Sequence, residues 1–411
     1  MKQLFMYGVT VCLVILVGCG KQPTVNQPEK TIRISPVEQE ILNANNSLGF
    51  DLLRQLSGAN GENTIISPVS ISMALGMTLN GAAGATYDSM QSVLGFQGLS
   101  REEINQSYRH LLDQLFTLDP DVLMEIANSI WIRDEFRVKE SFQNINHTNF
   151  DAEIRLLDFS MPSAVDIING WIAAKTHDRI SDVIDQIRAD VAMYLINAIY
   201  FNGTWTYKFD QSKTQDDLFS SGDGKTMTVD MMRQSNNYQY FSSDQIQVVD
   251  LPYGDGKYSM TIVLPASGYS LGDLIRSLNP EQWNTIIHSL HEQEGTLYLP
   301  RFEVSYKTIL NSALRSLGMG IAFSDNADFS GITDSVGLCI NQVIHQTFFH
   351  VDEAGTEAAA VTVVEIRFTS AGDDEHFYMI INRPFLFALR ERSSGAILFL
   401  GTVYQPERIK N

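Results

Sequence analysis

The order of the periodic segments along this chain constrains its fold more than any other feature. Apolar residues recur at helical spacing mainly in the early part, as in residues 37–56, where Ile41, Leu42, Leu48 and Leu52 share one face. Further helices are expected after Ser67-Pro68 and over residues 102–117 and 164–178. Runs rich in Ile, Val, Tyr and Phe predict strands over Val122–Arg133, Asp190–Phe201, Tyr258–Leu264, Thr296–Val304 and Phe377–Ile381. Helices early and strands late favour an α+β domain over an alternating parallel-sheet domain.

The length of 411 residues permits one large domain or two ordinary ones. After residue 36 we find no internal repeat, no low-complexity tract and no linker that would divide the chain. A single domain is therefore expected over residues 36–411.

The amino-terminal residues determine the expected compartment. Lys2 precedes an apolar run, Leu4–Val17, that is too short to span a bilayer with normal flanks and is typical of a signal peptide. Its end, Leu16-Val17-Gly18-Cys19, resembles the bacterial lipobox, which implies that the Cys19 thiol becomes diacylated. A simple secretory signal followed by a chance cysteine is the alternative.

These features predict a signal peptide over residues 1–18 and a lipidated flexible tether over residues 19–35, where Pro23, Pro28 and polar residues show no apolar period. The protein is then extracytoplasmic and lipid-anchored to a bacterial membrane, at the outer membrane or cell surface if the cell has two membranes.

The charge balance bears on the choice of partner. The chain has 48 acidic and 29 basic residues and a formal charge of -19, which becomes -19 - 1 = -20 when Lys2 leaves with the signal peptide. This charge argues against a nucleic acid or an anionic membrane surface as the partner. Of the three cysteines, Cys12 lies in the signal and Cys19 is lipidated, so Cys339 is the one left in the domain and no disulfide is expected there. Its apolar context favours a small packed side chain over a nucleophile.

Common enzyme constellations are absent from the sequence. There is no Gly-x-Ser-x-Gly elbow, no Ser-x-x-Lys pair and no His-Glu-x-x-His helix. His288 and His291, near Glu292 and Glu294, are interpreted as a solvated helix face because no third histidine or cysteine lies close by in the sequence. We therefore expect neither a catalytic site, nor a metal, nor a cofactor.

The segment from Glu353 to Ser370 has an unusual composition for a loop. As a strand, it would place Thr356, Ala358, Ala360, Thr362, Val364 and Ile366 on one face, and Glu357, Glu365 and Arg367 on the other. No proline occurs from residue 353 to residue 369, so every residue there can donate to a sheet, as a central strand requires. An ordinary strand of the native sheet is the simpler alternative.

Several stretches, in family order, resemble the serpin family. They are Asn63–Ile71, Asn169–Trp171, Thr176–Ile180, Leu195–Trp205, Leu251–Tyr253, Leu299–Phe302, Leu317–Met319, Ala327–Gly331, Glu353–Thr362 and Asn382–Phe385. Within them, His177-Asp178 departs from the family pattern, which usually has glycine or asparagine there. The resemblance implies an α+β serpin fold of about eight to nine helices and three β-sheets, with an exposed reactive-centre loop, residues 353–373, that inserts into the central sheet.

The resemblance also implies a function. The hinge of inhibitory members matches Glu353, Gly355, Thr356, Glu357, Ala358, Ala359, Ala360 and Thr362. Counting fourteen residues from Gly355 makes Thr369-Ser370 the expected scissile bond, while Arg367-Phe368 and Phe368-Thr369 stay open. The expected partners are serine proteases of elastase, subtilisin, trypsin or chymotrypsin type, and papain-like cysteine proteases as a further class, trapped by a monomeric inhibitor.

Supporting residues carry over individually. Ser67, Ser70, Asn197 and His345 match the family's polar cluster beneath the strands that must part. Trp205 matches the position where the loop first inserts, and Arg301 with Glu353 matches an ion pair there. A non-inhibitory serpin-fold binding protein is the alternative. Such proteins usually carry bulky, charged or proline residues in the hinge, and residues 356–362 include neither proline nor a bulky aromatic residue.

Overall fold

The computed structural model describes residues 32–57, 61–335, 337–356 and 376–408, and the part from Ile32 onward forms one compact unit. Ile32 and Ile34 pack against its core, and the Arg33 amide donates to Gln114 Oε1 at 3.2 Å. The packed unit therefore begins before Pro36, within the last residues of the predicted tether. Among the described residues, none of the helices has both the length and the apolar character needed to cross a bilayer.

The described residues form nine α-helices, which agrees with the predicted eight to nine. They are α1 (Pro36–Leu56), α2 (Pro68–Leu79), α3 (Gly84–Leu94), α4 (Arg101–Leu115), α5 (Glu140–Phe150), α6 (Ala164–Lys175), α7 (Leu271–Ser277), α8 (Pro280–Ser289) and α9 (Asn311–Leu314). Their starts follow local chemistry. Ser35 forms a capping box with Glu38 at the start of α1, and the Ser67 hydroxyl accepts from the Ser70 amide at the start of α2.

The strands form two hydrogen-bonded sheets. The nine-stranded sheet contains, in spatial order, β1 (Thr64–Ile66), β15 (Ile397–Val403), β14 (Phe385–Glu391), β8 (Tyr258–Pro265), β7 (Ile246–Tyr253), β6 (Thr226–Ser242), β9 (His291–Pro300) and β13 (Phe377–Ile380), with β5 (Gln215–Ser220) also paired to β6. The six-stranded sheet contains β10 (Phe302–Ile309), β11 (Gln342–Val351), β4 (Met193–Thr204), β2 (Val122–Arg133) and β3 (Glu153–Leu157), with β12 (Gly355–Thr356) also paired to β4.

The α+β class is confirmed. Two of the three expected sheets are joined within the nine-stranded sheet, because β6 pairs with β7 through residues 239–242 and with β9 through residues 231–240.

One predicted strand is wrong in its extent. Residues 296–304 were predicted as a continuous strand, but the chain leaves β9 at Pro300 and begins β10 at Phe302, in the other sheet. The break falls at Arg301, whose guanidinium is held by Glu353. His291 also differs from its predicted place, because it begins β9 and does not lie on the helix that carries His288.

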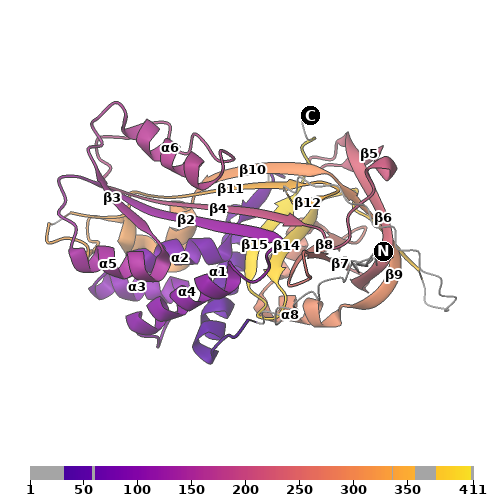
Figure 1. The fold of residues 1–411 in the computed structure, drawn as a ribbon, viewed down its shortest axis with the longest axis horizontal. Helices are drawn as coiled ribbons and strands as arrows, with labels where there is room; N and C mark the ends of the chain where they lie inside the picture. Colours follow the sequence, from indigo (N-terminus) through magenta and orange to yellow (C-terminus); the bar gives the residue numbers. More distant parts are fainter. Residues whose placement is uncertain (1–31, 58–60, 336, 357–375, 409–411) are drawn as a thin grey trace, which may run out of the picture. The chain divides into compact units, whose positions relative to one another are not determined.

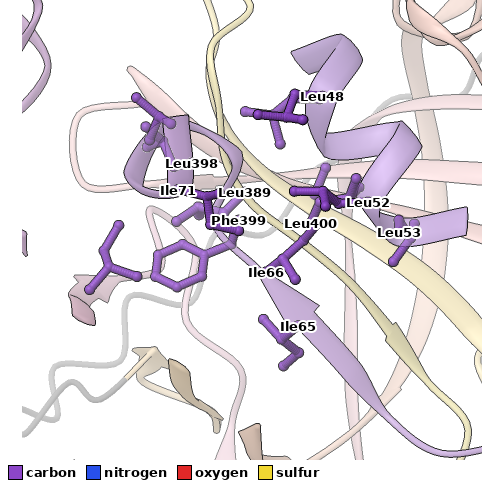
Figure 2. Packing of buried hydrophobic residues seen from close by; sticks show 14 of the residues in the cluster. Leu48, Leu52, Leu53, Ile65, Ile66, Ile71, Leu389, Leu398, Phe399 and Leu400 are labelled. Carbon is purple, nitrogen blue, oxygen red and sulfur yellow. The ribbon is translucent and has the colours of Figure 1, made fainter. Parts of the chain in front are cut away.

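The six-stranded sheet lies between two layers (Figure 1). On one face, α6 covers the sheet through Trp171, which packs edge-on against Trp131 of β2. The other face packs on the main core, to which α1, α2, β1 and the carboxy-terminal strands contribute (Figure 2). Side chains alternate along β4, so Leu195 and Ile199 enter the main core while Ile196 and Ala198 face α6.

Candidate functional site: an incompletely paired sheet and its hinge

The central strands β4 and β11 are parallel neighbours over only part of their length. Their pairing runs from Gln342 opposite Tyr194 to Thr347 opposite Ile199 and then ends, although both strands continue. At the far end of β4, the edge facing β11 is taken by β12, where Gly355 pairs with Thr204 and Thr356 with Gly203 in antiparallel orientation. The strands β4 and β11 are therefore paired with each other at one end. At the other end β12, which belongs to the predicted hinge, pairs with β4.

A buried polar cluster lies where β4 and β11 are paired with each other. It contains Ser67 and Ser70 of the α2 start, Asn197 of β4 and His345 of β11, each at most 2% exposed. The Ser67 amide donates to His345 Nε2 at 3.1 Å, so His345 Nδ1 carries the proton and donates to Asn197 Oδ1 at 2.8 Å. The Asn197 amide donates to the Ser70 carbonyl at 3.1 Å and contacts its hydroxyl. The four residues predicted to form a cluster are thus linked, each to the next, by hydrogen bonds.

Burial lowers the pKa of His345 to about 3, because the surroundings disfavour its charged form. The neutral ring suits its two hydrogen bonds, one as acceptor and one as donor. Protonation of Nε2 would make it a donor that faces the Ser67 amide, which is also a donor, so this hydrogen bond would be lost. The cluster consequently holds β11 to β4 and to the start of α2 only while His345 is neutral.

The chain turns sharply between β11 and β12. Asp352 Oδ1 accepts from the amides of Ala354 at 2.8 Å and Gly355 at 3.1 Å, which caps the turn. Gly355 has φ +154°, and a Cβ there would lie 2.1 Å from the Gly203 carbonyl oxygen. Only glycine fits this position, because the β4 backbone approaches so closely.

Glu353 and Arg301 form the predicted contact. The Glu353 side chain is 2% exposed and lies 2.6 Å from Arg301 Nη2, and Arg301 Nε donates to both of its oxygens at 2.8 and 2.7 Å. The Thr214 hydroxyl also contacts this carboxylate. This paired charge fixes the hinge to the chain between β9 and β10.

Trp205 and Tyr253 support the hinge from the core side. The Trp205 indole donates to the Asp352 carbonyl at 2.9 Å and stacks on Tyr253 with ring centroids 4.2 Å apart. Thr356 is fully buried, and its hydroxyl lies 2.6 Å from the Tyr253 hydroxyl. The Thr356 side chain therefore faces the core, which sets which face any continuation of β12 would bury.

A titratable side chain also lies at the hinge. His350 of β11 contacts Glu303 of β10 through Nδ1 at 3.2 Å and Asp352 through Nε2 at 3.6 Å. The Asp352 carboxylate, and to a lesser degree Glu303, raise the pKa of His350.

Sequence reasoning missed His350, Asp352 and Asn128. Asn128, a polar residue within the strand predicted over Val122–Arg133, was a usable signal, and its Oδ1 accepts from Asn197 at 2.7 Å.

Several predicted residues lie outside the described residues, and the structure does not bear on them. They are Cys19, Glu357, Ala358, Ala359, Ala360, Thr362, Arg367, Phe368, Thr369 and Ser370. Cys339 is described as a free, half-buried thiol whose pKa is raised by burial. Within the described residues, no group of three or more His, Cys, Asp or Glu side chains is arranged to hold a metal.

Fold and site together define an α+β protein whose central sheet is only partly paired between two parallel strands, beside a built hinge. The serpin (serine protease inhibitor) family model matches residues 43–406. Iripin-2 of Ixodes ricinus is 32% identical over 373 residues, covering 89% of this chain and 94% of that protein. The chain therefore belongs to the serpin family, whose members include protease inhibitors and are not enzymes in the catalytic sense.

Solved structures agree with this assignment. The thermophilic serpin Tengpin in its native state superposes with a TM-score of 0.83 at 31% identity, covering 91% of this chain and 96% of that one. Human thyroxine-binding globulin complexed with thyroxine gives a TM-score of 0.84 at 30% identity, covering 90% and 99%. The serpin fold is thus shared over nearly the whole described domain.

Proposed function

We propose that this protein inhibits serine endopeptidases, and papain-like cysteine endopeptidases as a further class, by trapping them during cleavage of the reactive-centre loop. The observation that carries the proposal is the hinge: β12 is already paired with β4, in the orientation and on the edge that a longer inserted strand would use. The enzyme would attack the Thr369 carbonyl, form an acyl-enzyme and release the segment that begins at Ser370. Insertion of the freed loop would then carry the enzyme away.

The register of β12 predicts the inserted strand residue by residue. Because Thr356 lies opposite Gly203 in an antiparallel pair, each step forward along the loop meets one step back along β4. The residues facing the core would then form the pairs Ala358 with Phe201, Ala360 with Ile199, Thr362 with Asn197, Val364 with Leu195 and Ile366 with Met193. Four of these partners belong to the main hydrophobic core. The polar pair would bring the Thr362 hydroxyl to the Asn197–His345 cluster.

This register gives the sequence pattern a physical reason. The small residues Ala358 and Ala360 would enter first, next to the hinge end of β4. The larger Val364 and Ile366 would reach their apolar partners last. The inserted strand would be antiparallel to both neighbours, replacing one parallel ladder with two antiparallel ones, which are slightly more stable per residue. Fourteen inserted residues would span roughly 46 Å, at about 3.3 Å each. That displacement would pull on the acyl-enzyme and block its hydrolysis.

The choice of target depends on residues near the cleavage point. Thr369 suits proteases with a shallow pocket, of elastase or subtilisin type, while Arg367 and Phe368 suit trypsin-like and chymotrypsin-like enzymes in neighbouring registers.

We further propose that Cys19 anchors the monomer to a bacterial membrane on the extracytoplasmic side. Mass spectrometry of detergent-extracted protein should find a diacylated Cys19 as the first residue. An unmodified amino terminus would refute the anchor.

The test is incubation with elastase, subtilisin, trypsin and chymotrypsin, followed by denaturing gel electrophoresis. We expect a covalent complex and a carboxy-terminal fragment that begins at Ser370. The variant Ala360→Pro should abolish trapping and leave cleavage, because proline cannot donate to the ladder. Ala360→Ser keeps the donor and serves as the matched control. Unchanged trapping by the proline variant would exclude insertion as the mechanism. No covalent complex between wild type and any of the four enzymes would favour a non-inhibitory binding role.

A further inference from the structure

A row of aromatic, apolar and charged side chains, exposed or partly exposed, crosses three strands, of which β13 follows the reactive loop in the sequence. Tyr378 and Ile380 of β13 are 62% and 40% exposed. Ile380 lies opposite Tyr298 of β9, which in turn lies opposite Arg233 of β6, so these side chains share one face of the sheet. We call Arg233, Tyr298, His376, Tyr378 and Ile380 the β13 stripe.

The β13 stripe is supported by packing on the inner face of the sheet and by contacts between its own side chains. On the inner face, the Phe377 ring stacks on Tyr240 with centroids 3.8 Å apart, above Gly295, where a Cβ would lie 2.2 Å from that ring. On the outer face, the His376 ring lies 5.0 Å from Tyr378, and the Arg233 guanidinium lies 5.5 Å from the Tyr298 ring. These contacts already restrict part of the side-chain freedom that would be lost when another surface covers the stripe.

Single exposed hydrophobic residues are ordinary, but a contiguous set rich in tyrosine and arginine has the composition of an interface centre. In the described part of the nine-stranded sheet, β13 is also the terminal strand, and its outer edge pairs with no other strand, although the Gln247 side chain of β7 donates to the Tyr378 carbonyl at 3.4 Å. The stripe therefore combines an apolar surface, rigid support and an unpaired strand edge.

Chain length identifies what can cover it. From Ser370 to Phe377 there are seven residue steps, which reach at most about 25 Å when fully extended. A protease domain of about 200 residues is about 40 Å across. An enzyme with its active site on the Thr369-Ser370 bond must therefore lie close to the surface that carries β13.

We infer that the β13 stripe is a docking surface for the body of the endopeptidase that attacks the loop, and this inference rests on the proposed function. The partner it fits is a protease with an apolar surface beside its active-site cleft. Contacts made by the stripe would act before cleavage and would raise the rate of capture. They would leave the later race between insertion and hydrolysis unchanged, because that race depends on the hinge and on β4.

The experiment measures the second-order rate constant of inhibition of subtilisin, elastase and chymotrypsin by the full chain. The double variant Tyr378→Ser/Ile380→Ser should be at least about tenfold slower with the enzyme that wild type captures fastest. Its stoichiometry of inhibition and its melting temperature should match wild type, since both side chains face solvent. Leu218→Ser is the matched control: Leu218 is 60% exposed, but it lies opposite Thr228, five positions before Arg233 along β6 and so on the other face.

The outcomes separate the two proposals. If wild type forms no covalent complex with any of the enzymes, the proposed function fails and the stripe fails with it. Equal rates for wild type and the double variant, with complexes formed by both, would overturn the stripe alone. A wild-type dimer that the double variant abolishes would assign the stripe to a second copy and would also overturn it. Should the double variant fail to fold, Tyr378→Ser alone gives the same comparison.

Discussion

The buried neutral His345 makes the stability of this serpin depend on pH in a predictable direction. In the unfolded chain, the His345 pKa is near its ordinary value of about 6.5, whereas burial lowers the pKa in the folded protein to about 3. As the pH falls below about 6.5, His345 becomes protonated in the unfolded state but stays neutral in the folded state. The free energy of unfolding therefore falls with acid, by about 2 kcal/mol between pH 7.5 and pH 5.0 from this residue.

Urea unfolding, followed by tryptophan fluorescence at the two pH values, measures this loss. In His345→Gln, the pH-dependent loss should shrink by about 2 kcal/mol, whatever the constant cost of the substitution. His350→Gln is the control with opposite sign. Because Asp352 and Glu303 raise the pKa of His350, its stabilising contribution is present at low pH and disappears as the pH rises through that raised pKa. Removing it should enlarge the acid loss. An acid loss in His345→Gln as large as in wild type would refute the role assigned to the polar cluster.

Three further substitutions test the hinge and the backbone. Thr356→Arg places a charge in a fully buried site and should slow insertion of the loop. The number of inhibitor molecules consumed per enzyme molecule trapped should then rise by about tenfold or more, and an unchanged number would contradict the register. Glu353→Ala leaves the Arg301 charge unpaired and should cost about 2–3 kcal/mol in urea unfolding, while Glu303→Ala, at a more exposed carboxylate, should cost less. Asp178→Gly relieves a residue at φ +61° and should stabilise the protein by about 1 kcal/mol, and a loss of stability would disprove the strain.

Local sequence signals were sufficient for most helices and for the site residues that lie in strong motifs. The start of α2 followed from Ser67-Pro68, because a serine cap and a proline in the first turn act locally. The polar residues Asn197 and His345 were predicted to meet from the family resemblance, and the parallel register of β4 and β11 places them side by side. The departure at Asp178 also has a physical meaning, because that backbone position is left-handed and favours glycine or asparagine.

Other features depend on contacts that sequence periodicity does not encode. The break at Arg301 separates two strands of similar apolar pattern, and it coincides with an ion pair to Glu353, which lies 52 residues away. The pairing of β12 with β4 depends on the close approach of Gly355 to Gly203. Asp352 and His350 were missed because the acid and the histidine act through a turn and a neighbouring strand, not through a motif.

The most direct test of the trap compares the melting temperatures of the intact protein and of the same protein cut once within residues 353–373. If the free loop completes the antiparallel strand that β12 begins, the cut protein melts at a clearly higher temperature, although it has lost a covalent bond. A cut protein that melts at or below the temperature of the intact one would contradict insertion, and with it the proposed mechanism of inhibition.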